Sequence, residues 1–348
     1  MKKKTKCVCV CGHFGFGKNL LNGQTIKTKI ITEGLKRKLG KDQVLNIDTH
    51  GGKRNLLSLP FSVFGMLVKC RNIVMLPAYN GLRVITPVLF LENIFFKRKL
   101  HYIVIGGWLS DFLKNKKLLL KMLKKFDYIY VETNTMKKSL ENKGFENVVV
   151  MPNCKDLKIV DEENFKSVEK PPYKLCTFSR VMREKGIEDA IEAIKFINEK
   201  YGYTVFTLDV YGQVDNEQKE WFELIKASFP DYVRYGGLIS FDKSVDILKD
   251  YFALLFPTHF YTEGIPGTII DAYASGIPVI SSLWENYGDV VDEGITGLSY
   301  EFLNIEDLKR ILEKVAESPE IIVAMKKACV RKAEKFTTEE VISIICLE

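Results

Sequence analysis

The residues of this chain best suited to chemistry are two acids on either side of a glycine and proline turn. Glu263 precedes Gly-Ile-Pro-Gly, and Asp271 follows within an apolar stretch. Pro266 suits the first turn of a helix, where its missing N–H would have no partner in any case. The backbone N–H groups of such a turn attract anions. We expect the anion site to be lined by Gly264, Ile265, Pro266, Gly267 and Thr268.

Two carboxylates beside an anion site predict a ligand that also offers hydroxyl groups. A sugar attached to a nucleotide diphosphate meets both requirements. The alternative is an ordinary strand–loop–helix–strand unit that carries a glutamate on its surface.

A pair of cations follows an earlier strand of the same half. Arg180 and Lys185 lie five residues apart between a predicted strand and a predicted helix. Arginine grips phosphates with two parallel hydrogen bonds and lysine acts as a point charge, so the pair suits a diphosphate. Two solvated surface cations are the alternative. Another strand ends at Gly237 and Leu238, where glycine lets a ligand approach the backbone closely.

Short β-type runs alternate with helical patterns through both halves of the chain, as in parallel sheets covered by helices on both faces. The predicted strands are 7–11, 44–47, 72–76, 102–105, 128–131 and 148–151, then 174–179, 205–211, 233–235, 252–256 and 279–281. Charged residues and prolines in 152–172 indicate a linker between the halves. We predict an α/β protein of two doubly wound, Rossmann-like domains that bind ligands in the cleft between their strand ends.

The composition excludes several classes of protein. Of 348 residues, 46% are hydrophobic and 27% are charged, which is typical of a globular protein. Cys7, Cys9 and Cys11 alternate with valines, which indicates a buried strand rather than a metal site. Scattered cysteines without a Cys-x-x-Cys pair favour a reducing, cytoplasmic location. No uncharged apolar run reaches about eighteen residues, so we expect no membrane-spanning helix.

The charge is distributed unequally between the halves. Residues 1–170 hold 32 basic and 14 acidic residues, a net +18, whereas 171–348 hold 19 and 30, a net −11. A basic domain attracts a membrane surface, a nucleic acid or a phosphorylated acceptor. Residues 112–126 form a basic amphipathic pattern that suits an anionic leaflet, and a solvated helix face is the alternative.

The order of motifs in the second half resembles a known family. Ser-Arg-x4-Lys-Gly, two strands that end in glycine, Glu-Gly-x-Pro-Gly, Ala-x-Ala-Ser-Gly-x-Pro-Val-Ile and Glu-Gly-x-Thr-Gly-Leu follow one another over residues 173–300. This series is similar to that of the retaining glycosyltransferases of family 4, which have the GT-B fold, and residues 1–165 agree in layout. The resemblance implies an acceptor-binding domain at 1–165, a nucleotide-sugar-binding domain at 166–330 and a C-terminal helix at 331–348 that packs back on the first domain.

The resemblance also implies roles for single residues. Arg180 and Lys185 would neutralise the leaving diphosphate, and Glu263 would hold hydroxyls of the donor sugar. Asp271 would bind the ribose, although the family has Glu there and Asp is one methylene shorter. After Ser282 the family often has Gly-Gly, where this chain has Trp-Glu-Asn-Tyr-Gly. Because of both departures, the sequence does not identify the donor sugar. For the nucleotide, we favour UDP.

The first domain would supply the acceptor side. The loop after the first strand contains Gly15 and Gly17, and Gln24 starts the first helix. Asp111 is a candidate acceptor contact, and a helix N-terminal charge is the alternative. The family's histidine after a middle strand has no counterpart here. The loop spacing is Gly-x-x-Gly-x-Gly, which argues against a nicotinamide cofactor.

We therefore expect a metal-independent hexosyltransferase without a cofactor, which acts with retention on a lipid-linked or other glycan acceptor in cell-surface polysaccharide (capsule or exopolysaccharide) biosynthesis. The expected partners are a nucleotide-sugar, a glycan or polyprenyl-diphosphate-linked acceptor and an anionic membrane surface, without nucleic acid. The location would be cytoplasmic, at the inner face of the cell membrane. A non-catalytic nucleotide-sugar-binding protein and an NAD-dependent oxidoreductase remain alternatives.

Overall fold

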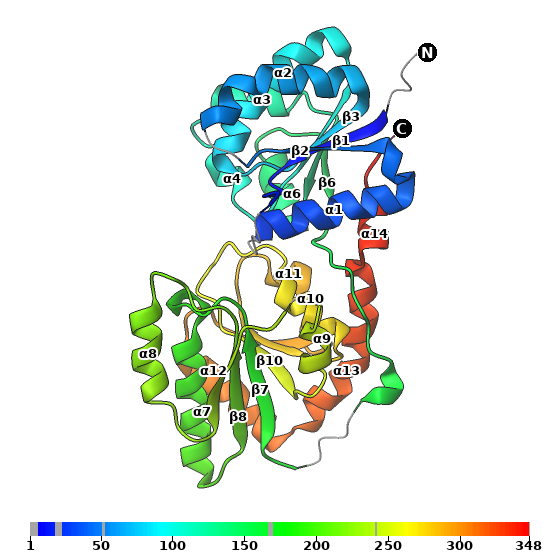
Figure 1. Ribbon diagram of the computed structural model, residues 1–348. Coiled ribbons are helices and arrows are strands. Elements are labelled where there is room, and N and C mark those ends of the chain that lie inside the picture. The colour runs from blue at the N-terminus through cyan, green and yellow to red at the C-terminus, as the bar shows by residue number, and fades with distance from the viewer. Residues whose placement is uncertain (1–5, 18–22, 51–52, 166–169, 241, 348) are drawn as a thin grey trace. The chain divides into compact units, whose positions relative to one another are not determined.

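The computed structural model describes residues 6–17, 23–50, 53–165, 170–240 and 242–347. The chain divides into two compact units. The first comprises Met1–Asp156 with Thr337–Glu348, and the second comprises Leu157–Phe336. Each unit is built on its own sheet of six parallel strands (Figure 1).

The strands of the first unit lie in the order β2-β1-β3-β4-β5-β6. They are β1 (Lys6–Gly12), β2 (Val44–Asp48), β3 (Cys70–Met75), β4 (Lys99–Ile103), β5 (Tyr128–Val131) and β6 (Val148–Val150). The helices are α1 (Gly23–Leu39), η1 (Lys41–Gln43), α2 (Lys53–Lys69), α3 (Tyr79–Phe96), α4 (Leu109–Phe112), α5 (Lys117–Leu123), α6 (Asn134–Glu141) and α14 (Thr338–Ser343).

Alternation along β1 shows why helices cover both faces of this sheet. Val8 and Val10 belong to the core cluster that includes residues of α1 and α14. Cys9 and Cys11 point to the opposite face and join the cluster that includes residues of α2 and α3. Successive side chains of a strand point to opposite faces, so a strand buried on both sides is apolar throughout. The cysteines thus act as small apolar residues, and burial raises the pKa of the Cys11 thiol to about 12.

The strands of the second unit lie in the order β12-β11-β10-β7-β8-β9. They are β7 (Tyr173–Phe178), β8 (Phe206–Tyr211), β9 (Val233–Gly237), β10 (Ala253–Phe256), β11 (Val279–Ser282) and β12 (Gly297–Tyr300). The helices are η2 (Glu162–Asn164), η3 (Arg183–Lys185), α7 (Ile187–Tyr201), α8 (Lys219–Ala227), α9 (Ser244–Leu248), α10 (Gly267–Ala274), α11 (Tyr287–Val290), α12 (Ile305–Glu317), α13 (Glu320–Ala333) and η4 (Glu334–Phe336).

The predicted α/β architecture of two doubly wound parallel sheets is confirmed. In the second unit, strand residues pack in two core clusters. One cluster includes residues of α7 and α12, and the other includes residues of α9 and α10. The sequence pattern missed β12, because Gly294 to Leu298 reads as a turn. It also predicted one helix over 109–125, where the structure has α4 and α5 separated by Leu113 to Lys116.

The chain enters the second unit earlier than the expected boundary at residue 165. The Val160 N–H donates to the Ala274 carbonyl oxygen over 2.9 Å. Phe165 lies close to Gly276: a Cβ added to Gly276 would come within 2.3 Å of the Phe165 ring. Residues 157–165 therefore pack as part of the second unit.

The last helix belongs to the first unit. α14 packs against α1, where Gly34 leaves room for it: a Cβ at Gly34 would lie 2.7 Å from side-chain atoms of Thr338 and Ile342. Residues 331–336, part of the C-terminal helix that the sequence predicts at 331–348, lie in the second unit. Within the described ranges, no helix has the length and apolar character needed to cross a bilayer.

Candidate functional site

The centre of the candidate site in the second unit is an ion pair between Lys185 and Glu263. Lys185 ends η3, after β7, and Glu263 lies in the loop after β10; parallel strands bring these ends to one edge of the sheet. The Lys185 ammonium donates to the Glu263 carboxylate, and both side chains are mostly buried. The Thr258 hydroxyl donates to the same carboxylate over 3.4 Å. The Lys185 ammonium also lies 4.8 Å from the ring centre of Phe260, a cation–π contact.

The backbone at Glu263 is held by a residue that the sequence reasoning missed. The Asn286 side-chain amide donates to the Glu263 carbonyl oxygen over 2.6 Å, and Asn286 is fully buried. Asn286 belongs to the stretch that departs from the family pattern after Ser282. Trp284 in that stretch is buried against Phe256, with ring centres 5.6 Å apart. The departure therefore supports the loop of Glu263 through packing and one amide.

Helix α10 begins directly after this loop. Pro266 is its N-cap and Gly267 its first residue, so the proline lies one position earlier than predicted. Within the described chain, no backbone hydrogen bond from the Gly267 or Thr268 N–H is present, whereas the Ile269 N–H reaches the Pro266 carbonyl oxygen at 3.1 Å. The Thr268 hydroxyl is buried and has no partner among the described residues. These three groups at a helix N-terminus can together receive an anion.

The other predicted residues of this segment lie deeper. Gly264 and Ile265 are buried in the loop before the helix. Asp271 lies one turn into α10 and is only 3% exposed.

Arg180 pairs with a different acid from Lys185. Its guanidinium lies 3.4 Å from the Asp215 carboxylate, and its side chain is 57% exposed. Exposed ion pairs of this kind contribute little stability, so the guanidinium can exchange Asp215 for another anion at small cost. Directly after Lys185, the chain turns at Gly186 with φ +65°; a Cβ at Gly186 would lie 1.9 Å from the Pro257 carbonyl oxygen.

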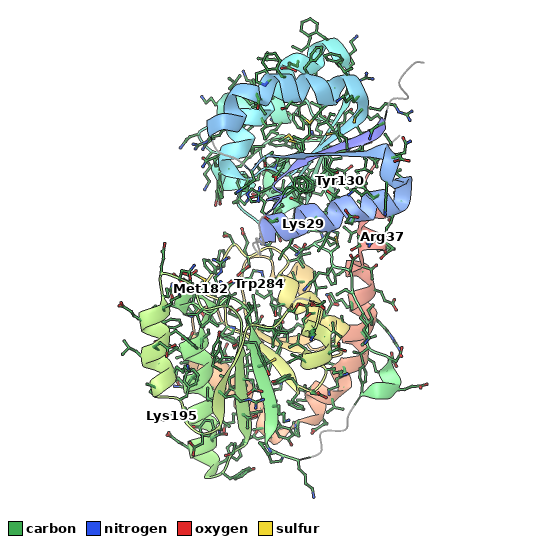
Figure 2. The ribbon with its side chains drawn as sticks, viewed as in Figure 1. Lys29, Arg37, Tyr130, Met182, Lys195 and Trp284 are labelled. Atoms are coloured by element: carbon green, nitrogen blue, oxygen red, sulfur yellow. The ribbon has the colours of Figure 1, made fainter. Side chains whose placement is uncertain are left out.

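Gly237 and Leu238 lie at the end of β9, at the same edge of the sheet. The Gly212 N–H donates to the Gly237 carbonyl oxygen over 2.9 Å, and Gly237 has φ +80°. Leu238 follows with its side chain 57% exposed. Figure 2 shows Met182, after β7, and Trp284, after β11, at this end of the second unit.

His259 is a second residue of the site that the sequence reasoning missed. Its Nε2 lies 2.8 Å from Asp189 Oδ2 on α7, and its backbone N–H donates to the Glu184 carbonyl oxygen over 2.8 Å. The hydrogen bond with Asp189 raises the pKa of the His259 imidazole above its ordinary value. The sequence signal that could have pointed to His259 is its position four residues before Glu263.

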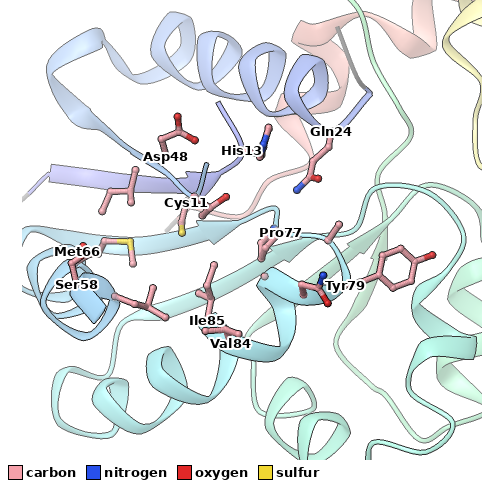
Figure 3. A pocket seen from close by; sticks show the side chains of 17 residues that line it. Cys11, His13, Gln24, Asp48, Ser58, Met66, Pro77, Tyr79, Val84 and Ile85 are labelled. Atoms are coloured by element: carbon pink, nitrogen blue, oxygen red, sulfur yellow. The ribbon is translucent and has the colours of Figure 1, made fainter. Parts of the chain in front are cut away.

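The first unit contains a pocket of about 540 Å³ at the carboxyl ends of β1, β2 and β3. Its polar side chains include Asp48, His13 and Gln24, which lie across the pocket from Met66 and Ile85 on α2 and α3 (Figure 3). The remaining lining residues are Cys11, Ile47, Thr49, Ser58, Leu59, Ser62, Pro77, Ala78, Tyr79, Asn80, Gly81 and Val84. An apolar floor with a few polar groups at one side suits an amphiphilic ligand.

The loop after β1 is held against this pocket by Asp48. The Asp48 carboxylate accepts from the backbone N–H groups of Phe14 at 2.9 Å, Phe16 at 3.0 Å and His50 at 2.8 Å. Hydrogen bonds from these backbone groups keep the pKa of Asp48 below its ordinary value despite the opposing effect of burial. The Asp48 carboxylate therefore holds the loop after β1 in place through backbone hydrogen bonds.

Two histidines of the first unit meet beside the pocket. His13 Nε2 lies 2.9 Å from His50 Nδ1, and His13 Nδ1 lies 2.7 Å from the Thr25 hydroxyl. Burial and the neighbouring His50 lower the pKa of His13.

The structure places the remaining residues that were predicted for the acceptor side in different surroundings. Gly15 and Gly17 both adopt positive φ, at 60° and 79°, in the loop after β1. Lys18 and Asn19 of that loop lie outside the described residues. Asp111 is exposed and pairs with Lys114 at 2.8 Å, and it does not line the pocket. Its contacts are those of a helix surface charge.

A buried ion pair at the same edge of the first sheet had no counterpart in the predictions. Lys27 on α1 pairs with Glu132 after β5, and each side chain is only 4% exposed. The Gly106 N–H lies 3.5 Å from the same carboxylate. A buried pair is costly to break, because it leaves one uncompensated charge, so it fixes α1 and the loop at Gly106 relative to β5.

Among the residues that the structure describes, no group of three or more histidine, cysteine, aspartate or glutamate side chains is arranged to hold a metal ion.

The chain matches the family model of glycosyl transferases group 1 over residues 160–336. It is 26% identical over 178 residues to the GtfA subunit of the UDP-N-acetylglucosamine–peptide N-acetylglucosaminyltransferase of Streptococcus gordonii, covering 50% of this chain and 33% of that protein. It is 23% identical over 167 residues to the amylovoran biosynthesis glycosyltransferase AmsK of Erwinia amylovora, covering 47% and 40%. The chain thus spans less than half of the length of these curated relatives.

The fold is similar to that of Anabaena Alr3699/HepE, solved in complex with UDP. The TM-score is 0.73, at 13% identity, and the superposition covers 97% of both chains. A second structure of that protein contains UDP and glucose, with a TM-score of 0.70. At this identity the likeness shows a shared fold.

Proposed function

The chain belongs to the glycosyl transferases group 1 family, and we propose that it transfers a hexose from a UDP-sugar to a lipid-linked or other glycan acceptor with retention of configuration. The acceptor would belong to cell-surface polysaccharide biosynthesis. The AmsK relative, whose name refers to amylovoran biosynthesis, and the UDP complexes of Alr3699/HepE support this choice.

The observation that carries the proposal is the Lys185–Glu263 pair beside the N-terminus of α10. A nucleotide-sugar needs a cation for its diphosphate and an acceptor of hydrogen bonds for its sugar hydroxyls. The pair offers both within one contact, and the N–H groups of Gly267 and Thr268 offer an anion site on the following helix. The buried, unpartnered Thr268 hydroxyl provides one more hydrogen-bonding group.

The leaving group defines what these residues do. As the bond between the sugar and the diphosphate breaks, negative charge grows on the phosphate oxygens. Lys185, Arg180 and the α10 N–H groups would stabilise that charge, and each such preorganised donor typically contributes about 3–4 kcal/mol. Glu263, released from Lys185 by the phosphate, would orient the sugar so that the acceptor hydroxyl attacks from the side that the diphosphate leaves and passes its proton to the departing phosphate oxygen. We propose that this chemistry needs no metal and no cofactor.

The acceptor would occupy the pocket of the first unit. Gln24, His13 and Asp48 give it polar groups for a sugar, and Met66, Val84 and Ile85 give it apolar surface. This combination suits a sugar joined to a lipid, and the charge of the first half, +18, suits a polyprenyl-diphosphate or an anionic membrane surface.

Two measurements test the proposal. Isothermal calorimetry compares the binding of UDP, GDP and ADP, and an activity assay then compares the hydrolysis of the corresponding nucleotide-sugars. We expect UDP to bind with the highest affinity, and UDP-hexose hydrolysis to persist in excess EDTA. The anomeric configuration of the released sugar, read by proton NMR before mutarotation, reports retention. Binding without hydrolysis or transfer in the presence of any glycan lipid would identify a non-catalytic nucleotide-sugar binder instead.

A further inference from the structure

The outer face of α2 and α3 in the first unit is apolar and exposed. On α2, Phe61 is 81% exposed, Phe64 54% and Val68 47%. Positions three and seven apart lie on one side of a helix, so these three side chains form one stripe. Isolated exposed apolar residues are common, but a stripe of aromatic and aliphatic residues marks an interaction surface.

Helix α3 carries a second stripe. Val84 is 37% exposed, Leu91 56% and Phe95 85%, and their spacing of seven and four residues again places them on one side. Ile94, which is 57% exposed, lies next to this stripe. Two helices of one face therefore each present an apolar stripe to solvent.

The two stripes belong to one surface. α2 and α3 lie side by side on the same face of the sheet (Figure 1). Near their C-terminal ends, the rings of Phe64 and Phe96 are in edge contact, with centres 5.4 Å apart. The Arg98 guanidinium donates to the Leu67 carbonyl oxygen over 2.9 Å and so joins the two ends.

The segment that contains this surface is strongly basic. Residues 58–125 contain twelve lysines and arginines but only two acids, Glu92 and Asp111. Lys69 directly follows Val68, Lys97 follows the α3 stripe, and both are exposed. Glu92 on α3 is partly buried, and burial raises the pKa of its carboxyl group. The charge is therefore complementary to an anionic surface.

We infer that the apolar face of α2 and α3, rimmed by lysine and arginine, docks into the headgroup region of an anionic lipid bilayer. Exposed aromatic rings partition into the interface between headgroups and acyl chains, and nearby cations attract anionic lipids. Val84 belongs to this face and also lines the pocket, so the docked bilayer would border the pocket opening. Docking concerns where the protein binds a membrane, and it goes beyond the proposed transfer reaction.

Sedimentation of the full chain with large vesicles tests the inference. One set of vesicles contains phosphatidylglycerol and phosphatidylcholine in equal amounts, and the other contains phosphatidylcholine alone. The test variant replaces three exposed residues of the face: F61S, I94S and F95S. The matched control replaces three exposed residues of the second unit, at 53%, 74% and 58% exposure: Y203S, L224S and L303S.

We expect the native chain and the control to bind the anionic vesicles, and the test variant to bind them about tenfold more weakly or worse. Neutralising the rim with K69Q and K97Q should weaken binding and reduce its dependence on salt. Unchanged melting temperatures would show that the variants are folded.

Three outcomes would overturn the inference. The test variant could bind as the native chain does and be released completely by salt, which would show attraction by charge without insertion. The control could lose binding equally. The native chain could form a dimer in sedimentation velocity without lipid and the test variant a monomer, which would identify a second copy as the occupant. UDP binding, measured on the same variants, should stay unchanged, so that failure of docking and failure of the proposed donor chemistry are distinguished.

Discussion

His259 Nε2 lies 2.8 Å from Asp189 Oδ2, and this contact joins the loop after β10 to helix α7. The loop carries Glu263, four residues before α10 begins at Gly267, and α7 follows the turn that carries Lys185. The backbone of His259 also bonds to Glu184, the neighbour of Lys185. The histidine thus fixes the distance between the two segments that supply the Lys185–Glu263 pair.

The first prediction concerns pH. The charged groups near His259 are Asp189 and Glu188 on α7 and Glu184 on η3, and all three favour its protonated form. Because the folded pKa of His259 is raised, its contribution to stability is complete below the unfolded value of about 6.5 and disappears as pH rises through the folded pKa. Urea unfolding of native chain and H259Q should therefore differ most near pH 6 and least near pH 9. A difference that does not change with pH would contradict the ion pair.

Loss of either cation should reduce donor turnover. We expect K185A to lower kcat for UDP-hexose hydrolysis by about a hundredfold or more, since a preorganised donor of this kind contributes about 3 kcal/mol. R180A should have a smaller effect, because its side chain is exposed and paired with Asp215. K195A, on the solvent side of α7, is the control. Unchanged turnover in both R180A and K185A would remove them from the site.

The two acids should differ in their effects. E263Q keeps the shape of the side chain but removes the charge that pairs with Lys185, so we expect a loss of kcat with little change in UDP affinity. Asp271 would act on the ribose, so D271N should weaken UDP binding, measured by calorimetry, more than it lowers kcat. The reverse pattern would exchange the two assignments.

The turn before α7 should tolerate only glycine. G186A places a Cβ 1.9 Å from the Pro257 carbonyl oxygen at φ +65°, so we expect it to destabilise the second unit by more than about 2 kcal/mol. Gly202 ends the same helix at φ +72°, and no atom lies within 4 Å of a Cβ added there. G202A should therefore lower the free energy of unfolding only by the conformational strain, about 1 kcal/mol. Equal melting temperatures for the two variants would contradict the close approach at Pro257.

Filling the pocket of the first unit should separate the two substrates. Ser62 lines that pocket from α2. S62F would occupy part of its volume of about 540 Å³, whereas S62A would leave it open. We expect S62F to lower transfer to a lipid-linked glycan by about tenfold while UDP-sugar hydrolysis stays unchanged. Equal transfer rates for S62A and S62F would place the acceptor elsewhere.

The sequence by itself determined the two parallel sheets and the segments that border the candidate donor site. Buried strands such as Val8–Cys11 are apolar throughout, and helices between them follow their own period, so both patterns are readable in the chain. The motif around Glu263 was readable for the same reason: glycine and proline constrain the backbone wherever they occur. These signals are local, because they depend on residues that are neighbours in the chain.

Only the tertiary structure decided which of these residues meet. Lys185 and Glu263 are 78 residues apart in sequence, much farther than residues that meet within one helix or one turn. They form a pair because β7 and β10 lie next to each other in the sheet. Asn286 and His259 support that pair through contacts over 23 and 70 residues. β12 escaped the sequence pattern because Gly294 to Leu298, where it begins, reads as a turn. Contacts between distant segments depend on strand order, and no local pattern encodes that order.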